Sequence, residues 1–175
     1  WIIDFSGAER IRKRYRRDGA RYQISPWALT WDNENYYLIG YDMDAGKMKH
    51  FRVDKMLHIE LQDQPREGRE EFGRFDLAQY TRRTFGMFGG NEETVRIRFP
   101  NKYVGVVIDR FGKDVALRPD GNDGFIARVI VAVSEQFYGW ITGLGREVKI
   151  VSPEWVAEEY MSLLKDLGSV YAGEQ

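Results

Sequence analysis

Few side chains in this 175-residue chain are of the types that carry out nucleophilic, acid–base or metal chemistry. The two histidines, His50 and His58, have no serine in a nucleophile motif to act with, and the chain has no cysteine. The spacing Asp42-x-Asp44-x-Gly46 shares its first acids with a calcium loop but lacks the closing glutamate, so it predicts a hairpin turn. We therefore expect no enzyme, no metal site and no cofactor.

Anion binding by basic and aromatic side chains is the better-supported chemistry. Aromatic rings stack on nucleobases, and arginine and lysine pair with phosphates. Both types of side chain gather between Arg21 and Lys55, near the ends of short β-like runs. The candidate ligand-binding residues in this stretch are Ser25, Trp27, Tyr37, Tyr41, His50, Arg52 and Lys55.

Each of these candidates also has a purely structural interpretation. Arg52 is two residues from Asp54 and can form an ion pair with it, or with Asp32. Ser25 precedes Pro26 and can serve as a cap at the end of a strand. The tyrosines of the set are equally suited to a hydrophobic core. The sequence leaves these alternatives open.

A basic run from Arg10 to Arg17 lies before this stretch. In a strand, Arg12, Arg14 and Arg16 share one face, because side chains alternate with a period of two. Such a stripe can follow the phosphates of a nucleic acid. The alternative is a solvated arm whose cations protect an exposed strand edge from aggregation. The net charge of the chain is only −1, so any basic surface must be a local patch.

The elements that would position these residues are three short strands joined by two polar turns. Residues 22–31, 36–41 and 48–53 are rich in aromatic and β-branched residues, and residues 32–35 and 42–46 are typical of turns. Because apolar groups occur on both faces of the middle run, we expect it at the centre of a strongly curved sheet or small barrel. The alternation in residues 56–61 predicts a strand that closes this barrel.

The second half of the chain has a different pattern. The polar segment 62–73, with one proline and two glycines, predicts a domain boundary, and a short helix is expected from Phe75. From residue 94 onward the order is strand, helix, strand, strand, helix, strand, followed by a long helix. Gly112, Ser134 and Gly145 are expected at helix ends. This order predicts a ferredoxin-like α+β domain.

The composition is that of a folded protein, with 43% hydrophobic, 14% aromatic and 30% charged residues. No apolar run approaches the roughly 18 residues needed to span a bilayer. The absence of cysteine and of a signal-peptide pattern favours a cytoplasmic location. The chain starts with Trp1 rather than methionine, so we expect it to begin inside a longer protein.

Three spaced motifs resemble those of the WYL domain of bacterial transcription regulators. They are Ser25-Pro26-Trp27-Ala28-Leu29, then Tyr36-Tyr37-Leu38, then Phe51-Arg52-Val53-Asp54-Lys55-Met56. Tyr36 and Lys55 stand where the family has tryptophan and arginine. The segments Ile108-Asp109-Arg110-Phe111-Gly112 and Phe137-Tyr138-Gly139-Trp140 resemble the C-terminal extension that follows many WYL domains.

The resemblance implies a two-domain effector region. The expected fold is a small SH3/Sm-like antiparallel β-barrel over residues 1–63, a connector over 64–93 and a ferredoxin-like domain over 94–175. It implies a ligand-sensing role for Arg52 and Lys55, with single-stranded DNA or a nucleotide-like anion as effector. It also implies a homodimer that binds duplex DNA through an N-terminal helix-turn-helix domain missing from this sequence. The alternative function is an oligomerisation module that binds no small ligand.

Overall fold

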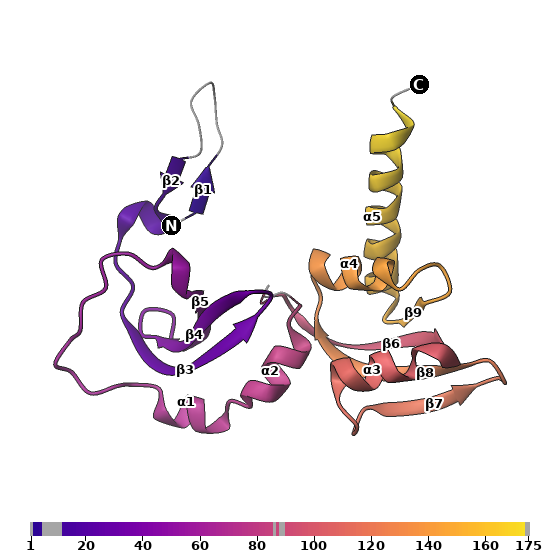
Figure 1. The fold of residues 1–175 in the computed structure, drawn as a ribbon, viewed down its shortest axis with the longest axis horizontal. Helices are drawn as coiled ribbons and strands as arrows, with labels where there is room; N and C mark the ends of the chain where they lie inside the picture. Colours follow the sequence, from indigo (N-terminus) through magenta and orange to yellow (C-terminus); the bar gives the residue numbers. More distant parts are fainter. Residues whose placement is uncertain (1, 5–11, 86, 88–89, 174–175) are drawn as a thin grey trace. The chain divides into compact units, whose positions relative to one another are not determined.

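The computed structural model describes residues 2–4, 12–85, 87 and 90–173. The chain divides into two compact units, Trp1–Asp76 and Leu77–Gln175, called here the N-terminal and C-terminal units. Among the described residues the strands form a two-stranded hairpin and a three-stranded sheet in the first unit, and a four-stranded sheet in the second (Figure 1). The predicted mixture of β and α+β structure is confirmed at this level.

The N-terminal unit is built on an antiparallel meander of three strands. Its elements are β1 (Ile2–Asp4), β2 (Arg12–Arg14), a 3₁₀ turn (Arg16–Gly19), β3 (Ile24–Asp32), β4 (Asn35–Asp42), β5 (Lys47–Arg52), a second 3₁₀ turn (Val53–Lys55) and α1 (Arg69–Arg74). The strand β4 lies between β3 and β5, as the sequence predicts. The turn predicted at Asp42–Gly46 is also confirmed, because β4 ends at Asp42 and β5 begins at Lys47.

A β-bulge in β3 controls which side chains face the covered side of this sheet. Ser25 pairs with Tyr41 and Ala28 with Ile39, and the register shifts between Pro26 and Ala28. Residues three apart would otherwise point to opposite faces, so the bulge brings Ser25 and Ala28 to the same one. That face includes Ile39, which is fully buried.

On the other face of the meander several large side chains near the β3–β4 turn are exposed. Leu29, Trp31 and Tyr36 are each more than half exposed there. The rings of Trp31 and Tyr36 pack edge to face with their centroids 4.6 Å apart. These two aromatic residues lie opposite one another at the β3–β4 turn and are supported mainly by each other.

The prediction of a closing strand at residues 56–61 is wrong. The segment has no regular structure, and Ile59 and Leu61 are 72% and 97% exposed. His58 has a positive φ of 53°, which interrupts an extended run. The alternating pattern is present, but no neighbouring strand pairs with it among the described residues.

The C-terminal unit contains an antiparallel sheet in the order β7-β8-β6-β9. Its elements are α2 (Leu77–Arg83), β6 (Glu92–Pro100), a 3₁₀ turn (Asn101–Tyr103), α3 (Val104–Phe111), β7 (Ala116–Asp120), β8 (Gly124–Ala132), α4 (Glu135–Gly143), β9 (Lys149–Ser152) and α5 (Glu154–Ala172). From β6 to β9 the predicted order of strands and helices is present. The last helix is about five residues longer than expected from the sequence.

One face of this sheet carries the main hydrophobic core. Inward-facing residues of the strands, such as Val95, Ile97 and Phe99, are fully buried against helix residues that include Val107 and Phe137. The helix ends follow the predicted signals. The Ser134 side chain accepts a hydrogen bond from the Phe137 amide, and Gly112 has a φ of +94°, which suits glycine.

The segment predicted as a connector contains two helices rather than one. α1 lies in the N-terminal unit, and α2 begins the C-terminal unit at Leu77. Within the described ranges, no helix is both long and apolar enough to cross a membrane.

Candidate functional site

The candidate anion-binding group lies at the end of β5, where the strand passes into a 3₁₀ turn. The Arg52 guanidinium donates two hydrogen bonds to Asp54, Nε to Oδ1 at 3.0 Å and Nη2 to Oδ2 at 2.9 Å. Lys55 Nζ is 3.3 Å from the same carboxylate. Two cations therefore share one anion, which leaves this group with a net positive charge on an accessible surface.

Arg52 and Asp54 each shift the pKa of the other. The hydrogen bond from Arg52 is the main reason that the pKa of Asp54 is lowered, and Asp54 in turn raises the pKa of Arg52. The Arg52 and Asp54 side chains are 38% and 49% exposed, so water screens their attraction.

Tyr37 and His50 lie beside Arg52 on the same face of the sheet. Tyr37 pairs with Arg52 in the β4–β5 ladder, and the Tyr37 and His50 rings pack edge to face at 5.9 Å. Tyr37 is only 6% exposed, and its burial raises the pKa of its hydroxyl. The structure thus brings Tyr37, His50 and Arg52 together on one face, and Lys55 joins Arg52 through their shared partner Asp54.

Ser25, Trp27 and Tyr41 belong to a different cluster, which fixes the segment before α1. The Ser25 hydroxyl accepts a hydrogen bond from the Glu67 amide at 2.9 Å, and Trp27 Nε1 donates one to the Glu67 carbonyl at 2.8 Å. The Trp27 ring stacks on Phe72 at 5.2 Å. These contacts account for Ser25 and Trp27 without a ligand.

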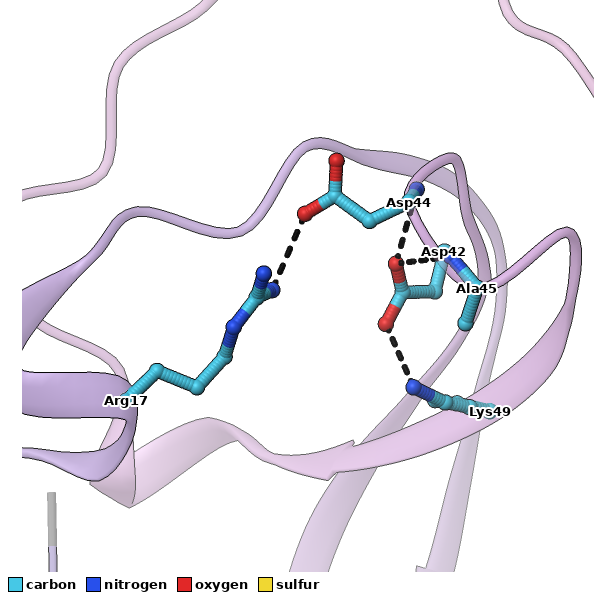
Figure 2. A network of polar contacts seen from close by, with 5 residues as sticks. All are labelled: Arg17, Asp42, Asp44, Ala45 and Lys49. Carbon is cyan, nitrogen blue, oxygen red and sulfur yellow. Dashed lines mark hydrogen bonds and ion pairs between the residues drawn. The ribbon is translucent and has the colours of Figure 1, made fainter.

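A second polar network closes the β4–β5 turn (Figure 2). Asp42 is 1% exposed; its Oδ1 accepts hydrogen bonds from the amides of Asp44 and Ala45, and its Oδ2 pairs with Lys49 Nζ at 2.7 Å. Arg17 reaches Asp44 at 2.9 Å. These residues and Tyr22 line a shallow open depression of about 240 Å³. Its two aspartates are already paired with its two cations, so we assign it a structural role.

The basic arm is only partly a strand. Arg12 and Arg14 belong to β2, which pairs with β1, but Arg16 begins the 3₁₀ turn instead of continuing the strand. The predicted single stripe of Arg12, Arg14 and Arg16 therefore does not form. Arg10 and Ile11 lie outside the described residues. The backbone turns at Arg17, Asp18 and Gly19, which all have positive φ angles.

Sequence comparison identifies both halves of the chain. Residues 7–61 match the model of the WYL domain, and residues 91–168 match the model of the WCX domain. The chain thus has a two-domain architecture of known type. It is a WYL-domain protein in which a WCX domain follows the WYL domain. No curated protein sequence matches the chain significantly.

Two solved structures align with this chain at low sequence identity. Proteasome accessory factor B/C (PafBC) of Arthrobacter aurescens aligns over 78% of this chain at 20% identity, with a TM-score of 0.39. A CRISPR Cas-related protein aligns over 90% at 15% identity, with a TM-score of 0.50, which supports a shared fold. The chain spans only 20% and 45% of the lengths of these two proteins.

Proposed function

We propose that this chain is the effector-sensing region of a WYL-family transcription regulator whose DNA-binding domain lies outside these 175 residues. The effector is a nucleic acid, such as single-stranded DNA, or a nucleotide-like anion. The observation that carries the proposal is the Arg52–Asp54–Lys55 group, which lies within the residues matched by the WYL domain model. The three-stranded meander β3-β4-β5 presents this group.

In the proposed mechanism a phosphate of the effector replaces the Asp54 carboxylate on Arg52. Arginine holds phosphate through two parallel hydrogen bonds, and Asp54 already receives two such bonds in this structure. Lys55 supplies a second positive charge. For the binding to act as a signal, the effector must favour one arrangement of the WYL domain and the ferredoxin-like WCX domain over another. The readout is DNA binding by a homodimer.

Replacing Arg52 by alanine tests this assignment. Loss of charge-assisted hydrogen bonds worth about 1.5–3 kcal/mol predicts at least a roughly tenfold weaker affinity for an anionic effector. Fluorescence anisotropy with a labelled 15-nucleotide single strand, over a range of salt concentrations, measures the affinity. Arg74→Ala is the control, because Arg74 is 83% exposed and pairs with Glu70 of the same helix. Equal binding by the Arg52 and Arg74 variants, with both folded, contradicts the assignment.

A second candidate function, oligomerisation without a small ligand, is supported by α5. Its C-terminal half extends away from the sheet of its own unit (Figure 1). Leu164, Leu167 and Tyr171 are 40%, 45% and 79% exposed, and their spacing places them on one helix face. A second copy of this helix is a suitable cover for such a stripe.

Replacing Leu167 by glutamate is expected to shift a dimer toward monomer. Burial of an unpaired charge costs several kcal/mol, so the dimer dissociation constant should rise by about tenfold or more. Light scattering at several protein concentrations gives the mass. Ser162→Glu introduces the same charge on the opposite face of α5 and should leave the mass unchanged. If the Leu167 variant keeps the wild-type mass, this helix face is not the dimer contact.

A further inference from the structure

The face of the C-terminal sheet opposite the core is strongly basic. In a strand, alternate residues share a face, and in a ladder, directly paired residues do so as well. Val95, Ile97 and Phe99 of β6 face the core, so Arg96 and Arg98 face the other way. Arg128 of β8 pairs with Arg96, and Lys149 of β9 pairs with Arg98. Arg118 of β7 pairs with Ile126, the partner of Arg98.

The acids on this face are already neutralised. Asp120 accepts a hydrogen bond from Arg98 at 2.7 Å, and Arg98 also contacts Asp123 at 3.1 Å. Glu92, at the other end of β6, pairs with Arg83 at 3.0 Å. Arg98 is thus satisfied, and the remaining cations have no ion-pair partner among the described residues. They are Arg96, Arg118, Arg128 and Lys149, all of them exposed.

This arrangement is unfavourable for the isolated sheet. Like charges placed directly opposite one another destabilise an antiparallel pair, and Arg96 faces Arg128 in this way. Folding alone gains nothing from four uncompensated cations on neighbouring strands. A polyanionic partner removes the repulsion and makes use of every one of them.

We propose that this face, defined by Arg96, Arg118, Arg128 and Lys149, is a second binding surface for single-stranded nucleic acid, separate from the Arg52 group. Each of the four strands contributes one unpaired cation, at lateral spacings of about 4.8 Å between neighbouring strands. The cations therefore form an arc across the whole width of the sheet. The exposed Ile130, two residues from Arg128, offers apolar surface beside this arc.

The flexibility of a single strand favours it over a duplex on this face. A flexible strand can bend to place successive phosphates on an arc of cations, whereas a stiff duplex meets a nearly flat sheet along a narrow line. The four cations offer phosphate contacts only, because none of the residues that define this face is aromatic. Recognition is therefore independent of base sequence and depends steeply on salt.

The test is the binding of a labelled 15-nucleotide oligothymidine to the full 175-residue chain between about 50 and 300 mM salt. Four phosphate contacts predict a contribution of about −2.8 to the slope of log affinity against log salt, at about −0.7 per contact. The double variant Arg96→Ala/Arg128→Ala should reduce the magnitude of that slope by about 1.4 and weaken binding at low salt by at least tenfold. The control, Arg146→Ala/Lys165→Ala, removes the same charge from exposed positions off this face.

The design separates this surface from the Arg52 group. The effects of the Arg96/Arg128 pair are measured with Arg52 intact and again with Arg52→Ala, and an undiminished loss in both backgrounds supports two independent surfaces. A blunt-ended duplex and polyglutamate of matched charge are titrated in parallel. Equal affinity for either of these competitors overturns the assignment to single strands. Equal losses in the face and control variants overturn the surface itself.

Discussion

Replacing Asp42 by alanine should destabilise the N-terminal unit by about 2–4 kcal/mol. The Asp42 carboxylate is buried, and it is the common acceptor for two turn amides and for Lys49. Its removal leaves those donors without their acceptor in a protected turn. Urea unfolding followed by circular dichroism, fitted with separate transitions for the two units, measures the loss.

Asp42→Asn is the matched control, because an amide oxygen can still accept the hydrogen bonds from Asp44 and Ala45. It should lose mainly the ion pair with Lys49 and cost less than half as much as alanine. A loss as large as that of alanine would show that the charge, rather than the turn geometry, stabilises the hairpin. An Asp42→Ala variant with the unfolding free energy of the wild type would contradict the structural role of the network.

The same network predicts a dependence of stability on pH. Burial alone would raise the pKa of Asp42, but the hydrogen bonds from Lys49 and the turn amides outweigh it and lower the pKa below 3.8. A carboxyl group whose pKa is lower in the folded state stabilises the fold above its unfolded pKa. This contribution is therefore complete at neutral pH and is lost as the pH falls from about 3.8 through the folded-state pKa. Asp42→Asn should lose less stability over that acidic range.

Replacing Gly68 by alanine should detach the segment that carries α1 from the sheet. Gly68 has a φ of +78°, and an added Cβ would lie 2.3 Å from Tyr41 Cγ, well inside contact distance. Left-handed backbone costs an L-residue about 1–2 kcal/mol, and overpacking adds about 1–3 kcal/mol. We expect a total loss of about 2–5 kcal/mol in the unfolding free energy of the N-terminal unit.

Gly73→Ala is the control for this prediction. Gly73 lies inside α1, and an added Cβ would meet nothing within 4 Å. Alanine at an open helix position should stabilise by about 0.5–1 kcal/mol. The two substitutions therefore have opposite expected signs although they are five residues apart. A neutral Gly68 variant would show that this segment does not pack on Tyr41 in solution.

The elements that the sequence predicts well are those with both an internal pattern and a marked end. The β3–β4–β5 meander has alternating aromatic and β-branched residues with polar turns, and α4 has a serine cap. Residues 56–61 have the alternating pattern of a strand but no signal that marks where a strand ends. A strand also needs a partner edge, and local alternation carries no information about one. The helix α1 was missed because its sequence is polar and its stabilising contact, the Trp27–Phe72 stack, is distant in sequence.

In the candidate site too, local contacts could be predicted from the sequence and long-range contacts could not. Arg52 and Asp54 are two residues apart, so the sequence could suggest an ion pair between them. It could not decide whether Arg52 pairs with Asp54 or binds a ligand. The hydrogen bonds that the Glu67 amide donates to Ser25 and that Trp27 donates to the Glu67 carbonyl join residues 40 or more positions apart. No spacing rule predicts such contacts. The basic face of the C-terminal sheet was predictable in part, because Arg96 and Arg98 are both out of phase with the core residues of β6.

The bulge in β3 makes chain length a constraint on one short segment, in addition to the side chains of Ser25 and Trp27. Trp27 is the residue between Pro26 and Ala28, and deleting it would restore a regular pleat. The side chains of β3 before the deletion would then point to the opposite faces of the sheet, and Ser25 would point away from the Glu67 amide. Gain or loss of a residue here would therefore break the contact between Ser25 and the Glu67 amide even if Ser25 itself were retained. Because α1 is anchored through this segment, we expect the number of residues between Ser25 and Ala28 to be the same in homologous chains.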